Sequence, residues 1–133
     1  MNVFVDTSVW SLAFRRDDPP SLPEIDELRR ALGSGSAIST GLVLQELLQG
    51  FSRPKAHQKI VEYFTSIPLL IPDRDDHVLA AELRNTCRKK GLQIGTIDAL
   101  LAQLSIRHEL PILTTDKDFE YVAHNSSLSI WMP

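Results

Sequence analysis

The sequence contains a single cysteine, Cys87, so no disulfide bond can form within the chain. Cys87 follows Leu79 and Leu83 at helical spacing, which predicts that its side chain packs in the core. With 133 residues, the chain is long enough to bury most of its apolar surface without disulfides or a structural metal. We therefore expect one domain covering residues 1–133.

Long hydrophobic runs are also missing. No apolar stretch approaches the ~20 residues that span a bilayer, and the amino terminus has no basic region followed by a small-residue cleavage site. The composition, 43% hydrophobic and 23% charged, is close to that of soluble globular proteins. These features predict a cytoplasmic protein with no membrane partner.

An excess of positive charge is absent as well. The formal net charge is -3, whereas nonspecific nucleic-acid binders usually carry a clear basic surplus. Basic residues nevertheless occur in local groups, one of which runs from Arg88 to Lys90 just before Gly91. We interpret that group as the solvated last turn of a helix, where positive charge complements the helix dipole.

Short apolar segments alternate with helical patterns along the chain. The expected strands are residues 2–5, 37–39, 69–71, 111–113 and 128–131. Helical patterns lie between them, at about 22–32, 41–51, 54–64, 76–90 and 96–107. Such alternation is typical of parallel sheets, because the crossover between two parallel strands usually contains a helix. We therefore predict an α/β fold: a three-layer sandwich in which helices flank a mostly parallel sheet of about five strands.

Residues that cap helices precede several of the helical patterns. Ser, Thr and Asp are favoured at this position because their side chains accept a hydrogen bond from a free backbone N–H. On this basis Thr40 should cap the helix over 41–51, and Asp75 or Asp76 should cap the one that follows the third strand. Thr96 should begin the helix that ends near His108.

Four acidic residues are expected at the edge of the sheet where the parallel strands end. Asp6 and Asp116 each follow a predicted strand, and sites in open α/β sheets form at the carboxyl ends of the strands. Glu46 and Asp98 lie within the first two turns of helices that begin near the same edge. Each acid could simply cap a helix, start a turn or lie exposed. Their joint placement at one edge favours a shared pocket.

A pocket of carboxylates has a clear chemical consequence. The carboxylates repel one another and resist burial unless a cation offsets their charge. Oxygen ligands without a Cys or His cluster suit Mg²⁺, with Mn²⁺ as a possible substitute, and match zinc poorly. Such an ion can activate water and neutralise charge on a phosphate. The residues therefore predict a metal-dependent phosphodiesterase whose catalytic residues and metal ligands are Asp6, Glu46, Asp98 and Asp116.

Polar neighbours of these acids could bond to the carboxylates or to water on the metal, as supporting residues of metal sites often do. The candidates for this accessory role are Thr7, Ser8, Thr96 and Thr115, together with Asp118 two residues after Asp116.

Other classes of α/β protein fit the sequence less well. No G-x-G-x-x-G motif follows the first strand, which excludes a dinucleotide-binding domain. Phosphoryl transfer through an aspartyl intermediate would place a second acid two positions after Asp6, where Ser8 stands. A signalling receiver domain would need an Asp at the end of the third strand, but Pro72-Asp73 there belongs to a Pro-rich loop. A metal-binding interaction domain without catalytic activity remains an open alternative.

Three segments together resemble a known family. They are VFVDTSVW at the amino terminus, STGLVLQELLQGF, and IGTIDALLAQLSIRHELPILTTDKDFEYVA. Their order and spacing make the chain similar over its full length to PIN-domain ribonucleases, specifically the VapC-type toxins of bacterial and archaeal toxin-antitoxin pairs. The four acidic positions of that family correspond to Asp6, Glu46, Asp98 and Asp116, whereas Asp118 falls where family members vary.

The resemblance implies more than the residues alone establish. It implies a single PIN domain with a five-stranded parallel sheet, Mg²⁺-dependent endoribonuclease activity on RNA, and a homodimer. It also implies inhibition by a small antitoxin protein that covers or enters the site. A PIN nuclease with a housekeeping role in RNA processing is the alternative within the same family.

Overall fold

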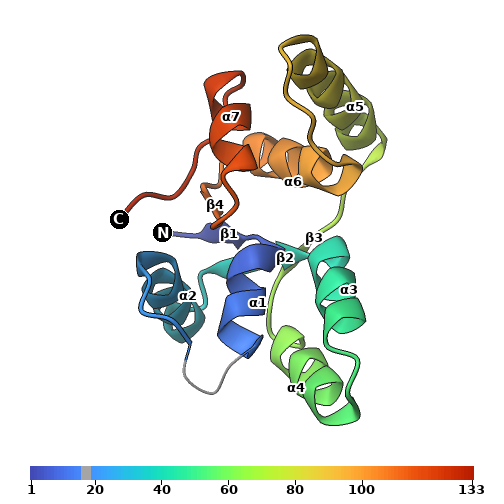
Figure 1. The fold of residues 1–133 in the computed structure, drawn as a ribbon. Helices are drawn as coiled ribbons and strands as arrows, with labels where there is room; N and C mark the ends of the chain where they lie inside the picture. Colours follow the sequence, from blue (N-terminus) through green and yellow to red (C-terminus); the bar gives the residue numbers. More distant parts are fainter. Residues whose placement is uncertain (16–18) are drawn as a thin grey trace.

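The computed structural model describes residues 1–15 and 19–133. In chain order its elements are β1 (Val3–Val5), α1 (Thr7–Arg15), α2 (Pro23–Ser34), β2 (Ala37–Thr40), α3 (Gly41–Gly50), α4 (Pro54–Phe64), β3 (Leu69–Leu70), α5 (Arg74–Lys89), α6 (Thr96–Arg107), β4 (Ile112–Leu113) and α7 (Asp118–His124). Helices α1 to α4 lie on one side of the sheet and α5 to α7 on the other (Figure 1). The predicted α/β sandwich with a central sheet between helical layers is confirmed.

The sheet of the described residues has four strands in the order β3-β2-β1-β4, and every pairing is parallel. The fifth strand expected at 128–131 is reduced to one parallel bridge between Ile112 and Ile130. That bridge uses both polar groups of Ile112, whose N–H donates to Ser129 and whose carbonyl accepts from Trp131. Because β4 has only two residues, and neighbouring residues turn their polar groups to opposite sides, no longer ladder can form there.

The core lies on both faces of this sheet. All three residues of β1 and both residues of β4 are buried, as expected for central strands covered by helices on both sides. On α6 every residue from Ala99 to Ser105 is buried, so this helix lies inside the helical layer rather than on its surface. A rigid interior therefore supports the ends of β1 and β4 and the start of α6.

Two of the helix caps differ from the sequence-based expectations. Asp73 caps α5, and it forms a capping box in which its side chain and that of Asp76 each accept a backbone N–H of the other. Thr40 makes no capping bond to α3, because its hydroxyl donates to the carbonyl oxygen of Leu70 on the neighbouring strand. Thr96 is the first residue of α6, which confirms the predicted start of that helix, and Gly95 occupies the cap position.

The buried face of α5 also differs from the prediction. Cys87 is fully buried, which confirms its place in the core. Leu79, however, is 44% exposed, so the expected stripe through Leu79 and Leu83 is wrong at its first position. The buried residues of α5 are Asp76, Ala80 and Cys87, because the polar side chain of Asp76 is directed toward partners on α6.

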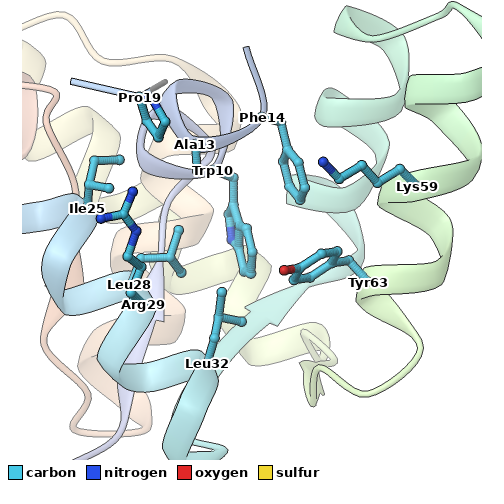
Figure 2. A pocket seen from close by; sticks show the side chains of 10 residues that line it. All are labelled: Trp10, Ala13, Phe14, Pro19, Ile25, Leu28, Arg29, Leu32, Lys59 and Tyr63. Atoms are coloured by element: carbon cyan, nitrogen blue, oxygen red, sulfur yellow. The ribbon is translucent and has the colours of Figure 1, made fainter. Parts of the chain in front are cut away.

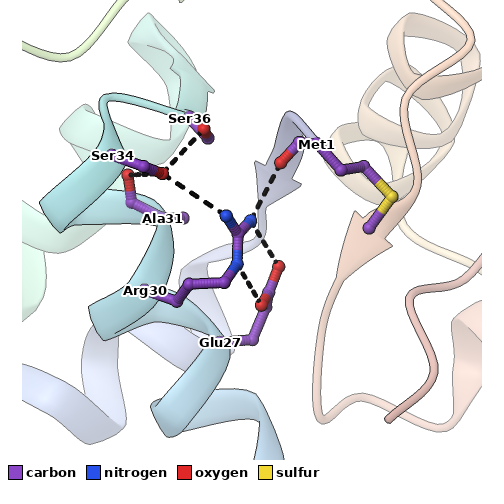
Figure 3. Close-up of polar contacts among 6 residues, drawn as sticks. All are labelled: Met1, Glu27, Arg30, Ala31, Ser34 and Ser36. Atoms are coloured by element: carbon purple, nitrogen blue, oxygen red, sulfur yellow. Dashed lines mark hydrogen bonds and ion pairs between the residues drawn. The ribbon is translucent and has the colours of Figure 1, made fainter.

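A polar cluster fastens the amino terminus to α2 (Figure 3). The Arg30 guanidinium pairs with Glu27 through two hydrogen bonds of 2.6 and 2.8 Å, and it also donates to the carbonyl oxygen of Met1 at 2.9 Å. The Arg30 hydrogen bond holds the pKa of Glu27 below its usual value. Glu27 thus stays charged on a helix face that would otherwise exclude it.

No helix in the part of the chain that the structure describes is long and apolar enough to cross a membrane.

Candidate active site

The ends of β1 and β4 lie side by side because the two strands pair in parallel. Val5 is the register partner of Leu113, so the next residues, Asp6 and Thr114, leave the sheet together. The Asp6 N–H donates to the Leu113 carbonyl oxygen at 3.0 Å, which continues the ladder by one step. Asp6 is therefore fixed by the sheet itself.

The Asp6 carboxylate is only 5% exposed and receives several hydrogen bonds. Its Oδ2 accepts from the Thr114 hydroxyl at 2.8 Å, from the Ser8 hydroxyl at 2.9 Å and from the Ser8 N–H at 3.4 Å. Burial raises the pKa of Asp6 above its usual value, and these hydrogen bonds offset only part of that rise.

Ser8 joins the two strand ends. Besides donating to Asp6, its hydroxyl lies 3.3 Å from the Thr114 hydroxyl and accepts the Thr115 N–H at 3.0 Å. Thr115 thus contributes its backbone here, while its side chain is exposed. The sequence patterns do not single out Thr114, although the residue after β4, in register with Asp6, is the position that could have indicated it.

Glu46 reaches this edge from the second turn of α3. Its Oε1 accepts the Thr7 hydroxyl at 2.8 Å, which links α3 to the first turn of α1. Because Thr7 is the neighbour of Asp6, the bond holds the Glu46 carboxylate beside the end of β1.

Asp98 occupies the first turn of α6, where its carboxylate is partly buried. Burial raises the pKa of Asp98 to about 6, and repulsion from four other carboxylates adds to the effect. In order of their contribution these are Asp6, Asp116, Glu46 and Asp118. Since repulsion between charges weakens with distance, these four acids lie near enough to Asp98 to raise its pKa.

Asp116 and Asp118 form the turn that leads into α7. The Asp116 N–H donates to the Thr114 hydroxyl at 3.0 Å, and Asp116 Oδ1 accepts the Asp118 N–H at 2.9 Å. The turn-forming role considered for Asp116 is therefore present together with its place beside Asp98. Thr96 is exposed, and the structure gives it no side-chain hydrogen bond among the described residues.

The donor set has the chemistry that a divalent metal ion prefers. Every nearby acidic ligand offers oxygen, and the repulsion that raises the pKa of Asp98 is what a divalent cation would offset. Within residues 1–15 and 19–133, no three Asp, Glu, His or Cys side chains lie close enough together to hold a metal ion as they stand. The carboxylates are thus neighbours that do not form a metal-binding group in this arrangement.

A separate cavity of about 320 Å³ lies between α1, α2 and α4 (Figure 2). Its floor is aromatic: Trp10 stacks on Phe14 with ring centroids 5.9 Å apart, and Phe14 meets Tyr63 edge-on at 5.6 Å. Two cations, Arg29 and Lys59, stand on its rim. The buried Trp10 Nε1 has no hydrogen-bond partner among the described residues.

Comparison with known proteins gives consistent matches. Residues 3–125 match the family model described as "PIN domain". The chain is 27% identical over 128 residues to the VapC ribonuclease Mb1587 of Mycobacterium bovis, covering 95% of both chains. It is 31% identical over 97 residues to the ribonuclease VapC of Rickettsia bellii, which covers 67% of this chain and 72% of that protein.

Solved structures share the fold. The structure of FitAcB from Neisseria gonorrhoeae superimposes with a TM-score of 0.77 at 18% identity, covering 98% of this chain and 97% of the other. A DNA-bound VapBC from Salmonella typhimurium gives a TM-score of 0.76 at 19% identity, covering 98% of both chains.

Proposed function

This chain belongs to the PIN-domain family and within it to the VapC ribonucleases, and on that premise we propose that it is a Mg²⁺-dependent endoribonuclease acting as the toxin of a toxin-antitoxin pair. The observation that supports this most is that four carboxylates on separate elements lie near enough to Asp98 to raise its pKa, while Asp6 and Glu46 are held by hydrogen bonds at the same edge of the sheet. As part of the same proposal, residues 1–133 form a single PIN domain that acts in the cytoplasm.

We assign the metal to four carboxylates, those of Asp6, Glu46, Asp98 and Asp116. When bound, a Mg²⁺ ion, or Mn²⁺ in its place, would supply Lewis-acid activation of water and neutralise charge on the phosphate. The surrounding residues hold these ligands in position. Ser8 and Thr114 hold Asp6, and Thr7 holds Glu46.

Asp118, Thr96 and Thr115 have accessory roles at most in this proposal. Asp118 makes the smallest contribution to the rise in the pKa of Asp98 among the four acids around it. Thr96 and Thr115 have exposed side chains. We expect substitutions of these three residues to affect cleavage less than those of the four ligands.

The aromatic cavity is the surface that best suits the antitoxin. An apolar side chain of the partner would fill the space over Trp10 and Phe14. Arg29 and Lys59 on the rim favour acidic residues next to that side chain. We therefore expect the antitoxin to dock with an amphipathic, acidic segment.

Exposed apolar residues in α5 and just before it support the proposed homodimer. Ile71 is 82% exposed, and Val78 and Leu79 on the first two turns of α5 are 52% and 44% exposed. Large apolar side chains that gather on a surface usually meet a partner. A second copy of the chain, meeting this face with the same residues, would bury them.

The activity is tested on a circular single-stranded RNA, which only an endonuclease can open. With Mg²⁺ we expect the purified chain to linearise this RNA, and with EDTA in place of Mg²⁺ we expect no product. Opening in EDTA would contradict the metal site. If the protein folds but never opens RNA of any sequence, the non-catalytic alternative replaces the enzyme.

Binding of the ion is tested separately from cleavage. A ligand at one hundred times its Kd raises the free energy of unfolding by about 2.7 kcal/mol, so saturating Mg²⁺ should raise the Tm of the wild-type chain measurably. Asp98→Ala should lose most of this rise, whereas Asp118→Ala should keep it. An equal rise in all three proteins would mean that the ion binds elsewhere.

The toxin role is separated from a housekeeping role in RNA processing by growth. Induced expression of a toxin should arrest growth, and co-expression of a small protein encoded beside its gene should relieve the arrest. Growth that is unaffected by the active nuclease would favour the housekeeping alternative.

A further inference from the structure

A small cavity of about 150 Å³ lies between α5 and the segment that leads into α6. It is lined by Arg84 and Arg88, one helical turn apart on α5, and by Leu92, Gln93 and Ile94. The Arg84 Nε donates to the carbonyl oxygen of Ile94 at 2.9 Å. This bond fixes one guanidinium in the wall of the cavity and leaves its terminal N–H groups without a hydrogen-bond partner among the described residues.

The cavity is close to the acidic site along the chain. Ile94 is bonded to Gly95, and a Cβ atom placed at Gly95 would lie 4.0 Å from Asp98 Oδ2. Given the dimensions of the backbone, the Arg84 guanidinium is within roughly 12 Å of the Asp98 carboxylate. Groups at this separation can contact neighbouring phosphates of one RNA strand.

Arg84 and Arg88 differ from the ion-paired arginines of the protein, although among the described residues Arg53 and Arg74 also lack a carboxylate partner. Arg29, Arg30 and Arg107 are each paired with at least one carboxylate. Among the residues that the structure describes, Arg84 and Arg88 pair with none, and the one side-chain bond of Arg88 goes to the neutral Asn85 at 3.2 Å. Their positive charge is therefore available to an anion from outside.

Charge at a helix end accounts for only part of this arrangement. Arg88 belongs to the last turn of α5, where a cation complements the helix dipole. Arg84 lies a full turn earlier, beyond the range of that effect, and its guanidinium is turned to the loop before α6. Two fork-shaped donors beside an amide side chain suit the oxygens of a phosphate group.

We propose that Arg84 and Arg88, together with Gln93, form a subsite that binds the RNA backbone at phosphates flanking the one that is cleaved. This inference rests on the proposed ribonuclease function. The subsite also accounts for how a chain with a net charge of -3 and an acidic cleavage site can hold a polyanion. It contributes to binding and takes no part in the chemical step.

The subsite is tested by salt-dependent binding of a fluorescently labelled single-stranded RNA of mixed sequence, measured by anisotropy in EDTA so that no cleavage occurs. Each lost phosphate contact lowers the slope of log K against log salt by about 0.7. We expect Arg88→Gln to show this change with a loss of affinity of roughly threefold to tenfold, and the double variant with Arg84→Gln to show about twice the change in slope.

Arg74→Gln is the matched control, because Arg74 is an exposed arginine at the other end of α5, about 21 Å from Arg88 by the rise of a helix. It should leave both affinity and slope unchanged. Arg84→Lys keeps the charge without the fork, so it should restore the slope but only part of the affinity. Tm values of all variants show whether the lost bond to Ile94 has instead disturbed the fold.

The outcomes separate the subsite from the nuclease. Arg88→Gln should raise KM for RNA cleavage in Mg²⁺ and leave kcat unchanged. Equal losses in Arg74→Gln, or no loss in the double variant, would overturn the subsite while cleavage by the wild-type chain stands. RNA that binds through these arginines but is never cut would overturn the nuclease and leave the subsite. Failure to bind or cut RNA at all would overturn both.

Discussion

Two carboxylates on neighbouring helices, the buried Asp76 of α5 and the partly buried Asp98 of α6, have opposite surroundings. Asp76 is 0% exposed, and Arg107 approaches it at 2.8 Å while Gln103 and the Asp73 N–H also donate to it. Burial alone would raise the pKa of Asp76, but these donors together lower it. Around Asp98 the neighbours are acids, and its pKa rises to about 6.

The difference separates charges that serve the fold from charges that serve a ligand. At Asp76 every part of the cost of burial is met by partners within the chain, so the group can be expected to stabilise the structure. At Asp98 no partner in the part of the chain that the structure describes offsets the free-energy cost of burial and charge repulsion. Acids with strongly perturbed pKa values of this kind cluster at functional sites. The comparison therefore predicts that substitution of Asp76 lowers stability, whereas substitution of Asp98 lowers RNA cleavage.

The largest expected effect is the loss of cleavage in Asp98→Asn. Removing one metal ligand should lower kcat by about 10³-fold, because the charge that holds the ion and the developing phosphate charge are both affected. Asp118→Asn is the control from the same acidic edge, and it should lower kcat by less than about tenfold. Cleavage rates on a labelled RNA at saturating Mg²⁺ measure both. If Asp98→Asn kept wild-type kcat, the assignment of Asp98 would be wrong.

The next largest expected effect is a loss of stability on substitution of Asp76. Asp76→Ala breaks the capping box and leaves Arg107 without its closest partner, which should cost about 3 kcal/mol in free energy of unfolding. Asp75→Ala, at the exposed neighbour, should cost less than about 0.5 kcal/mol. Urea denaturation gives both values. The kcat of folded Asp76→Ala should equal that of the wild type, and a large loss of kcat would erase the distinction between the two regions.

The smallest expected effect is on the pH dependence of stability, which should have opposite signs for Asp98 and Asp76. With its folded pKa near 6 and above the unfolded value, Asp98 contributes stability that is complete below about pH 4 and disappears as the pH rises through 6. In EDTA at pH 7.5, Asp98→Asn should therefore be more stable than the wild type by about 1 kcal/mol, a value reduced for the partial exposure of the group. The gain should vanish near pH 4.

Asp76 should show the opposite dependence. Its folded pKa lies below the unfolded value, so its contribution is present above the unfolded pKa and is lost as the pH falls through the folded pKa. Denaturation series across pH for the wild type, Asp76→Ala and Asp98→Asn distinguish the two signs. Parallel curves for the two variants would contradict the different treatment of the two carboxylates.

Features set by residues close in the chain are the ones that the sequence predicts well. Asp6 follows the apolar strand β1 directly and Asp116 follows β4 after two threonines, so their place near the end of the sheet is a local property. The α/β layers follow from the alternation of patterns in the same way. The metal and catalytic roles of the four acids remain predictions that the experiments above address.

Features that depend on pairing between distant segments are harder to predict from the sequence. Thr114 contacts Asp6 because β1 and β4 pair in one particular register, which no local pattern indicates. Asp73, Asp75 and Asp76 are nearly equivalent as caps by residue type, and the capping box selects Asp73. Leu79 fits the helical stripe but is exposed, since the bond between Asp76 and Arg107 fixes which face of α5 meets α6.

The hydrogen bond from Arg30 to the Met1 carbonyl oxygen has a practical consequence. Strand β1 runs from that point toward Asp6, so anything joined to the amino terminus emerges at the opposite end of the strand from the carboxylates. A biotin or a dye attached there should leave the acidic edge facing solvent. Immobilised in this orientation on a sensor surface, the protein would present its cleavage site to RNA in the flow.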